Sequence, residues 1–342
     1  MFPNFYGNSQ AAGRLWDIAQ SGRIPQTLLL SGPEGIGKAT LARRFAALVL
    51  GDPGRIELDD VSREPNQALI AEREKWTAEK RNEDPLVFSS HPDFLTFAPD
   101  GPLRQISIPQ MRLLREKAQF QPLRGTRRVF LIDRIDRANE QAANSLLKTL
   151  EEPPPHLVIV MTAENAYDLL PTIRSRAVMI QLGRLSDEEM EAFVRARGLD
   201  DSARRIALAA GSPGAAATLD LELYTARRAA MLALLETGAG ASPFSSWAKV
   251  AESLSTRKQD RIEDLMNVLL LLLEDILLLQ NNVSSIRNRD LERPLATLAR
   301  RVSFGWLRTA AAQAAELCAL ARRNIQKPLA LDAFVISLTR AA

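Results

Sequence analysis

The chain contains 342 residues, of which 46% are apolar and 25% are charged, and its formal net charge at pH 7 is +3. This length corresponds to about two or three domains, and the composition is that of an ordinary soluble protein. Because the net charge is small, any binding to nucleic acid must depend on local clusters of basic side chains.

A single cysteine, Cys318, excludes an intramolecular disulfide and a zinc site built from several cysteines. Its alanine-rich helical surroundings predict a small buried side chain rather than a reactive thiol. This cysteine usage fits a reducing compartment, and we expect a cytoplasmic protein. The first ten residues show no basic segment followed by an apolar one, which is the pattern of a secretory signal.

The most hydrophobic stretch, residues 262–279, has a short unbroken apolar run. This run extends from Val268 to Leu273 and is interrupted by Glu274 and Asp275. A membrane span needs roughly 18 or more apolar residues. We therefore predict a helix buried on most sides, in a core or a subunit interface, and no membrane partner.

The first half of the chain alternates β-rich runs with helical patterns. This rhythm is typical of βαβ units and predicts an α/β fold, with a parallel sheet and helices on both of its faces. The expected strands are residues 27–31, 93–97, 128–133 and 157–162, and the expected helices are residues 38–50, 108–119 and 139–152.

From about residue 186 the strand signals stop. Ser186, followed by Glu189, forms a capping box that begins a helix, and a second helix near 201–210 leads to a turn at 211–214. The remaining sequence is helical, with loops near 237–245 and 281–291. We predict three domains: an α/β domain over residues 1–184, a small helical domain over 185–222 and an all-α domain over 223–342.

Residues 52–90 form a charged segment between the first helix and the second expected strand. The simplest interpretation is a surface insertion of one or two solvent-exposed helices.

A phosphate-binding loop follows the first strand, where residues 32–39 read GPEGIGKA. The spacing matches G-x-x-x-x-G-K-[S/T] at every position except the last. Gly32, Gly35 and Gly37 allow backbone N–H groups to surround a triphosphate, and Lys38 would meet its β and γ oxygens. The helix that follows would add its positive amino terminus.

The last position of this motif normally supplies a hydroxyl group that binds Mg²⁺. Ala39 has no hydroxyl, and Thr40 is turned about 100° further around the helix. Two interpretations stay open: a site that binds ATP and Mg²⁺ weakly, and an empty loop kept for its shape.

The strand over residues 129–133 ends in Asp133, at the usual position of an aspartate that faces Mg²⁺. The next residue would normally be a glutamate that polarises the attacking water. Here it is Arg134, which cannot accept a proton because its pKa exceeds about 12. Asp136 could replace the glutamate only if the backbone bent differently, so we expect no useful ATP hydrolysis by this chain alone.

Polar residues also follow the fourth strand, where Thr162 is placed either to sense a γ-phosphate or to form an ordinary loop. Ser175 lies between Arg174 and Arg176, which are either solvated surface residues or an arginine finger offered to a neighbouring subunit's nucleotide. Such an arginine can accelerate phosphoryl transfer by about 10³–10⁵-fold, because its planar fork matches phosphate oxygens.

Two histidines have simpler structural interpretations. His91 and Asp93 suggest a turn before a strand, because no nucleophile lies nearby in the sequence, and His156 suggests a loop residue. The sequence contains no cluster with metal-ligand spacing and no esterase-type serine motif.

Four stretches together resemble the clamp-loader branch of the AAA+ family, and within it the delta-prime subunits of bacterial DNA polymerase III. They are the phosphate loop 32–39, HPD at 91–93, NSLLKTLEEPP at 144–154 and LLPTIRSRA at 169–177. The resemblance covers residues 25–185 strongly and the helical remainder loosely, where residues 324–331 (NIQKPLAL) are similar to the last helix region of these subunits.

The resemblance implies an AAA+ phosphate-loop core, a helical lid and a helical collar that closes a five-membered ring. It also implies a non-motor subunit that offers Arg176, with Ser175 beside it, to an adjacent ATPase subunit. The implied partners are the gamma/tau and delta subunits, and through the assembly the sliding clamp and primer–template DNA. Any enzymatic activity would then belong to the DNA polymerase III holoenzyme as a whole.

The sequence departs from the family pattern at several positions. Ala177 replaces the usual cysteine after Arg176, and the segment 52–90 stands where related subunits carry a four-cysteine zinc module, so no zinc is expected. No arginine lies near 211–214, where motor subunits contact nucleotide. Two alternatives stay open: an active AAA+ motor subunit or other remodeller, and a phosphate-loop kinase, which the long helical tail disfavours.

Overall fold

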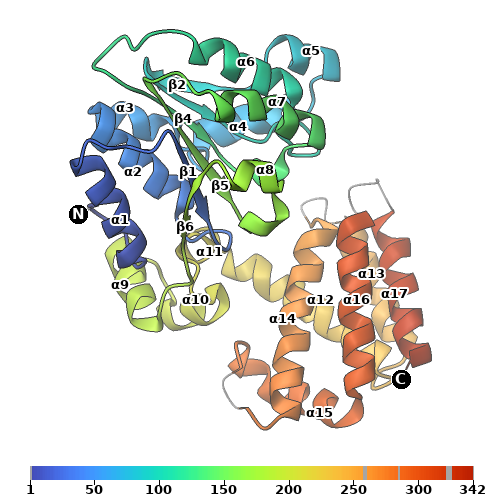
Figure 1. Ribbon diagram of the computed structural model, residues 1–342. Coiled ribbons are helices and arrows are strands. Elements are labelled where there is room, and N and C mark those ends of the chain that lie inside the picture. The colour runs from blue at the N-terminus through green and yellow to red at the C-terminus, as the bar shows by residue number, and fades with distance from the viewer. Residues whose placement is uncertain (1, 257–259, 284–285, 321–325, 342) are drawn as a thin grey trace. The chain divides into compact units, whose positions relative to one another are not determined.

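The computed structural model describes residues 2–256, 260–283, 286–320 and 326–341 (Figure 1). These residues form two compact units: the first contains Met1–Ser202 and Ala209–Ala217, and the second contains Ala203–Leu208 and Thr218–Ala342. The predicted division into three domains at residues 184 and 222 stays a prediction. Of the stretch 324–331, Asn324 and Ile325 lie outside the described residues.

The first unit is built on a six-stranded sheet with the order β2-β3-β4-β5-β1-β6. Four of its five neighbouring pairs are parallel, as expected for βαβ connections. The strands are β1 (Thr27–Ser31), β2 (Phe88–His91), β3 (Phe94–Phe97), β4 (Arg128–Ile132), β5 (Leu157–Ala163) and β6 (Val178–Gln181).

The sheet is mostly parallel, as predicted, and the antiparallel pair at one edge involves a strand that was not predicted. β2 pairs antiparallel with β3 through the short turn at Pro92 and Asp93. The sequence of β2 has no clear apolar pattern, because Ser89 and Ser90 at its centre are polar and exposed. An edge strand needs only one paired side, so such a polar segment can still complete the sheet.

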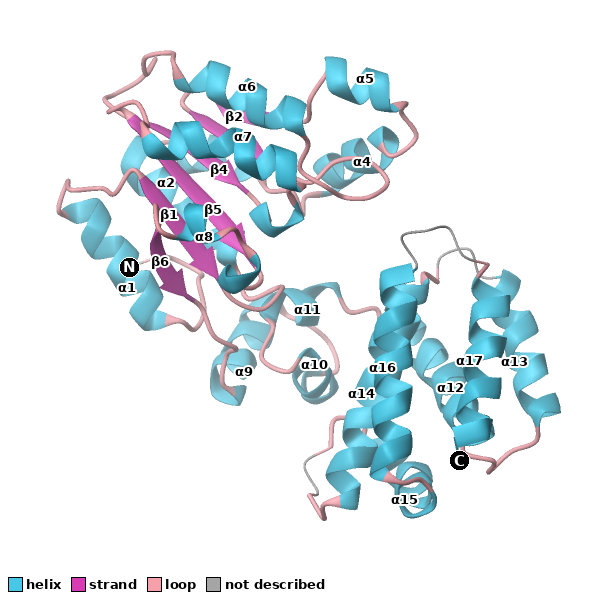
Figure 2. Ribbon diagram, turned by 45° about the vertical axis from the view of Figure 1, so that its right-hand side comes forward, coloured by secondary structure: helices cyan, strands magenta, loops and turns pink. Residues whose placement is uncertain are grey.

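Helices cover both faces of this sheet, as predicted. Alternate residues of β1, β4 and β5 pack on opposite sides: Leu28 contributes to a core with α1 and α2, whereas Leu29 contributes to a core with α6 and α7. Figures 1 and 2 show these helix pairs on either side of the strands. The helices of the first unit are α1 (Ser9–Gln20), α2 (Lys38–Leu50), α3 (Pro53–Ile56), α4 (Glu64–Arg73), α5 (Ala78–Glu83), α6 (Ile108–Ala118), α7 (Glu140–Glu151), α8 (Pro171–Arg174), α9 (Asp187–Arg197) and α11 (Pro213–Thr218), with short 3-10 turns η1 (Glu57–Asp59), η2 (Ile135–Arg137) and η3 (Ala166–Asp168).

The segment 52–90 is more than a solvated insertion. The guanidinium of Arg43 is buried and bonds to Glu57 at 3.0 Å, and buried Arg73 bonds to Asp100 at 2.7 Å. A separate apolar cluster forms around Ile70 of α4 and includes Leu86, Phe88 and Ala98. Because buried guanidinium groups require paired carboxylates, the charges of this segment anchor it to the α/β core.

The second unit is entirely helical in the part of the chain that the structure describes. The helix α10 (Ser202–Ala209) is divided between the two units. The other helices are α12 (Leu221–Gly238), α13 (Phe244–Thr256), α14 (Ile262–Gln280), α15 (Glu292–Arg301), α16 (Phe304–Leu320) and α17 (Lys327–Ala341), with the 3-10 turn η4 (Arg289–Leu291).

The helix α14 is the centre of the second unit's core, as its composition predicts. Only Asn267 and Glu274 of this helix are exposed. Asp275 is completely buried, and its carboxylate accepts hydrogen bonds from the backbone N–H groups of Arg287 and Asn288 at 2.8 and 3.0 Å. Among the helices that the structure describes, none combines the length and apolar character needed to cross a bilayer.

Two further expectations concern the helical part. The capping box of Ser186 and Glu189 begins α9 as predicted. The turn at 211–214 is shorter than predicted, because α11 already begins at Pro213. Proline is well suited to the first turn of a helix, where its missing N–H is not required.

Candidate functional site

The phosphate loop, Asp133 and Thr162 meet at one edge of the sheet. β5 lies between β1 and β4, so the ends of these three parallel strands are adjacent. The loop follows β1, Asp133 follows β4, and Thr162 is on β5. In open α/β sheets this carboxyl edge is the usual place of a ligand. The structure therefore brings together the residues that the sequence predicts for a nucleotide site.

The loop has the backbone conformation that its glycines permit. Gly32 has a φ of 148°, and a Cβ atom there would lie 2.2 Å from the carbonyl oxygen of Leu182. Its N–H group donates to the carbonyl oxygens of Ala163 and Glu164, both at 3.2 Å. Glycine is required here because no side chain fits between the loop and the neighbouring backbone.

The start of α11 packs directly against the loop. The N–H of Gly214 donates to the carbonyl oxygen of Gly35 at 2.8 Å, and the hydroxyl of Ser212 donates to that of Glu34 at 3.0 Å. A Cβ atom on Gly35 would lie 2.3 Å from the Ser212 Oγ atom. The segment 211–214 thus closes against the outside of the loop with small residues and without an arginine.

Lys38 bonds to the loop that carries it. Its Nζ atom donates to the carbonyl oxygens of Gly32 and Pro33 at 2.6 and 2.7 Å. Burial lowers the pKa of this amine, and the negative charge of Asp133 opposes part of that change. Two of its three N–H donors are therefore already engaged. Ala39 and Thr40 follow in the first turn of α2 and are half-buried.

Asp133 and Thr162 form a hydrogen-bonded pair. The hydroxyl of Thr162 donates to the Asp133 Oδ1 atom at 2.6 Å and accepts from the backbone N–H of Arg134 at 2.8 Å. Burial raises the pKa of the Asp133 carboxyl group, and the hydrogen bond from Thr162 partly counteracts this rise. The Thr162 hydroxyl therefore holds the turn after β4 rather than pointing freely into the loop.

Arg134 occupies the position where an ATPase would carry its general base. Its backbone is in the left-handed region, with a φ of 60°, and its Nη1 atom donates to the Glu34 Oε1 atom at 2.8 Å. Within the described residues, the buried Oδ1 atom of Asp136 has no hydrogen-bond partner. The cation thus forms an ion pair across the loop and leaves no proton acceptor at position 134.

Ser175 and Arg176 lie at the opposite edge of the sheet. β6 runs parallel to β1, with Val178 aligned with Leu28, so the residues just before β6 lie at the amino ends of these strands. At about 3.3 Å per residue, the five-residue strand β1 spans roughly 17 Å. Arg176 is therefore too distant to act on a phosphate held in its own chain's loop.

The Arg176 side chain is oriented but accessible. Its Nη1 atom donates to the carbonyl oxygen of Thr172, and its Nη2 atom donates to the Glu151 Oε1 atom, both at 2.8 Å. About 32% of the side chain is exposed. Nearby, the Arg174 guanidinium lies 5.0 Å from the ring centre of Tyr167.

Both histidines have structural roles, as predicted. The Nδ1 atom of His91 accepts from the N–H of Asp93 at 3.1 Å within the β2–β3 turn. The Asp93 carboxylate accepts from the backbone N–H groups of Leu123 and Arg124. The His156 Nε2 atom lies 3.1 Å from the carbonyl oxygen of Ala118, in the loop before β5.

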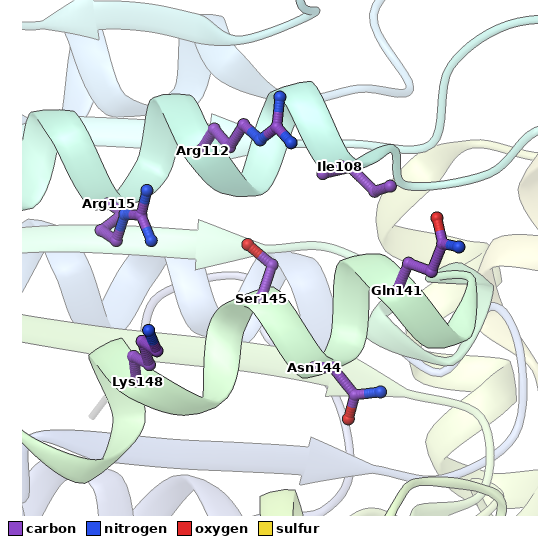
Figure 3. A pocket seen from close by; sticks show the side chains of 7 residues that line it. All are labelled: Ile108, Arg112, Arg115, Gln141, Asn144, Ser145 and Lys148. Atoms are coloured by element: carbon purple, nitrogen blue, oxygen red, sulfur yellow. The ribbon is translucent and has the colours of Figure 1, made fainter.

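A basic groove between α6 and α7 was not predicted from the sequence. Figure 3 shows Arg112 and Arg115 on α6, and Ser145 and Lys148 on α7; Ile108, Gln141 and Asn144 complete the lining. Within the described residues, none of its three cations forms an ion pair. The signal was present in the spacing: on each helix these residues recur at three- and four-residue intervals, opposite the buried face.

This groove has the chemistry of a phosphate site. It presents three cations, two amides and one hydroxyl, and no carboxylate. Cationic and neutral donors of this kind are the groups that proteins direct at phosphate oxygens.

Comparisons with known proteins point to one replication family. The family described as DNA polymerase III, delta subunit, matches residues 7–186, more than half of the chain. The chain is 31% identical over 232 residues to DNA polymerase III subunit delta' of Pseudomonas aeruginosa, with 65% of each chain covered. It is also 30% identical over 175 residues to DNA polymerase III subunit gamma of Buchnera aphidicola, covering 51% of this chain and 43% of that one.

The chain thus spans less than two thirds of the length of these curated relatives. Among solved structures, a gamma subunit-related protein of DNA polymerase III from Thermotoga maritima aligns with a TM-score of 0.46 and 17% identity, over 95% of this chain and 98% of that chain.

Proposed function

The chain belongs to the family described as DNA polymerase III, delta subunit, and we propose that it is a non-motor subunit of a clamp loader. In this role it assembles with gamma/tau ATPase subunits and a delta subunit, and Arg176 completes the ATP site of a neighbouring subunit. The assembly then places a sliding clamp on primed DNA.

The position of Arg176 is the observation that carries this proposal. The side chain lies at the sheet edge opposite its own phosphate loop, about one strand length away, and it keeps an exposed face. A guanidinium group in such a place can serve a phosphate of another subunit but not one of its own. Its planar fork suits bidentate contact with phosphate oxygens.

The chain's own loop supports the non-motor part of the proposal. Ala39 lacks the hydroxyl that binds Mg²⁺, and Arg134 replaces the general base. Lys38 and Arg134 both bond to residues of the loop itself. These residues do not fit a hydrolytic centre for Mg²⁺ and ATP, so we assign no catalytic step to this loop.

The basic groove supports a role at DNA. Arg112, Arg115 and Lys148 could contact phosphates of the double helix, which would position DNA without reading its sequence. The surrounding subunits would supply the remaining contacts, since three cations alone give weak binding.

The rival function is that of an ATPase subunit. It is favoured by the similarity to a gamma subunit and by the retained glycines and Lys38. The two functions differ in which cation matters: Lys38 for a motor subunit, and Arg176 for a subunit that serves its neighbour.

Reconstitution of the clamp loader with motor and delta subunits tests the proposal. We expect Arg176→Ala to lower DNA-stimulated ATP turnover by about 10³-fold or more at the site that it completes, and clamp loading to fall with it. Lys38→Ala should leave both activities close to the wild-type values.

Arg23→Ala is the matched control, because Arg23 is another exposed arginine that lies outside the α8 region. Gel filtration should show that every variant enters the assembly. Full activity of the Arg176→Ala assembly, or loss of activity in the Lys38→Ala assembly, would contradict the proposed function.

A further inference from the structure

Glu151 is the acidic residue that contacts Arg176. It is the last residue of α7, and α7 contacts α8. The Glu151 Oε1 atom accepts from the Arg176 Nη2 atom at 2.8 Å, while the Thr172 carbonyl oxygen accepts from Nη1. We propose that Glu151 is a positioning residue, which fixes the Arg176 guanidinium for contact with a phosphate of the neighbouring subunit; this rests on the proposed function.

The backbone that carries Glu151 is itself held in place. α7 ends at this residue, and Pro153 and Pro154 lead the chain toward β5. The Gln26 Nε2 atom, just before β1, donates to the carbonyl oxygens of both prolines at 3.1 Å. The end of α7 is thus tied to the amino edge of the sheet, the same edge at which Arg176 lies. The backbone that carries Glu151 is therefore held near Arg176, and the ion pair itself orients the Glu151 carboxylate.

The contacts of Arg176 leave donors for a ligand. A guanidinium group has five N–H donors in one plane. Glu151 and the Thr172 carbonyl each accept a hydrogen bond of 2.8 Å from one N–H group. The Ser175 Oγ atom lies 3.4 Å from Nη1. Because the two strong acceptors come from different helices, they determine both the direction and the plane of the group. Two N–H groups or more remain for phosphate oxygens.

Folding stability does not explain this ion pair. About 32% of the Arg176 side chain and 48% of the Glu151 side chain are exposed, and exposed ion pairs contribute little to stability. Orientation, in contrast, matters for catalysis: a long side chain held in one rotamer loses less freedom when it meets the transition state, and a displacement of about 1 Å can cost up to about 10²-fold in rate.

The experiment measures kcat and KM for ATP in the reconstituted assembly. At the site that Arg176 completes, we expect Glu151→Ala to lower kcat roughly tenfold, within the range that misplacement causes, with little change in KM. Glu151→Gln should restore most of the rate, because its amide oxygen still accepts the Arg176 hydrogen bond. Glu152→Ala is the matched control: this neighbouring carboxylate is exposed, and no ion pair involves it in the part of the chain that the structure describes.

A double variant separates positioning from an independent effect. Glu151→Ala combined with Arg176→Ala should be no slower than Arg176→Ala alone, because Glu151 acts only through Arg176. A further tenfold loss in the double variant would overturn the proposal. A wild-type or faster kcat for Glu151→Ala would also overturn it; a faster rate would mean that Glu151 holds the arginine away from its target.

The outcomes distinguish this inference from the function on which it rests. If Arg176→Ala is inactive and Glu151→Ala is fully active, only the positioning role fails. If both variants are fully active, the arginine finger and its positioning fail together. Equal melting temperatures for Glu151→Ala, Glu151→Gln and the wild type establish that a rate loss does not come from unfolding.

Discussion

The phosphate loop and the α8 corner (Thr172, Ser175 and Arg176, with Glu151 of α7) both carry cations suited to phosphate, but these cations are used differently. At the loop, Lys38 bonds to two carbonyl oxygens of the loop and Arg134 pairs with Glu34. At the α8 corner, Arg176 bonds to two acceptors, and about 32% of its side chain is exposed.

Under the proposed function, this difference means that the phosphate-loop motif alone does not identify the residue that acts on ATP. The loop has nearly the full sequence signature, yet its contacts are internal and close it against α11. The α8 corner has only a short and unspecific sequence motif. Its hydrogen bonds nevertheless orient the Arg176 guanidinium, which can donate further hydrogen bonds. The following experiments test whether the loop is now mainly structural and whether the basic groups elsewhere act on phosphates.

The largest expected effect concerns Gly32. A Cβ atom at this position would lie 2.2 Å from the Leu182 carbonyl oxygen, which is backbone and cannot rotate away. We expect Gly32→Ala to destabilise the chain by about 2–4 kcal/mol, as strain at a special backbone conformation does. Chemical denaturation of the isolated chain measures the change.

Gly51→Ala is the control for Gly32→Ala. Gly51 also has a positive φ, of 78°, but nothing lies near its added Cβ atom. Gly51→Ala should lower the stability of the chain only through backbone strain, by about 1 kcal/mol. Equal losses of stability for the two variants would contradict the claim that the loop at Gly32 is packed tightly against the Leu182 backbone.

The basic groove should give the next largest effect. We expect the triple variant Arg112→Ala, Arg115→Ala and Lys148→Ala to weaken binding of the assembly to primed DNA by at least about tenfold at low salt. The salt slope should fall by roughly 0.9 for each phosphate that the variant no longer neutralises. Fluorescence anisotropy over a range of salt concentrations measures both quantities.

Arg195→Ala, an exposed arginine on α9, controls for a general loss of charge. An unchanged salt slope in the triple variant would show that the groove does not meet phosphates.

Asp133 gives a smaller, pH-dependent effect. Burial raises the pKa of its carboxyl group in the folded chain, so between the unfolded and folded pKa values the native state binds more protons and its stability falls as the pH rises. Asp133→Asn avoids this fall, and its amide oxygen can still accept from Thr162. We expect the variant to be more stable than the wild type by about 1 kcal/mol at pH 7.

Thermal unfolding at two pH values tests whether Asp133→Asn is more stable than the wild type and how this difference depends on pH. The advantage of Asp133→Asn should shrink as the pH is lowered toward about 4, near the pKa of the unfolded aspartate. A less stable variant at pH 7 would mean that the charged carboxylate is required by the loop.

The smallest effect is expected for Glu34→Gln. The pair between Glu34 and Arg134 is largely exposed, with about 67% of the Glu34 side chain accessible. Exposed pairs contribute about 0–1 kcal/mol, so the melting temperature should change little. ATP turnover should not appear, because position 134 still lacks a proton acceptor. A gain of turnover would show that this ion pair alone suppresses a competent motor.

Much of the α/β core could be predicted, because its strands are continuous apolar runs and its helices have clear caps and proline boundaries. β1 and α2 have the expected bounds, and β4, β5, α6 and α7 differ by a residue or two at their ends. β2 was missed because it is a short edge strand with two exposed serines at its centre.

The site could be predicted only in part, because its contacts join residues that are distant in the sequence. Asp133 and Thr162 are recognisable from their positions at strand ends, but their direct bond depends on the strand order. The pair of Glu151 and Arg176 joins the end of α7 to the turn after α8, 25 residues further along the chain. The groove requires α6 and α7 to face one another, which no local pattern specifies.

The central claim is that this chain supplies a cation to a neighbouring ATP site because its own loop cannot hydrolyse ATP. Steady-state ATP turnover by the purified chain, without any other subunit, tests this claim most directly. The rate should equal the background rate without protein and should be the same for the wild type and for Lys38→Ala. Clear turnover by the wild type that Lys38→Ala abolishes would contradict the account.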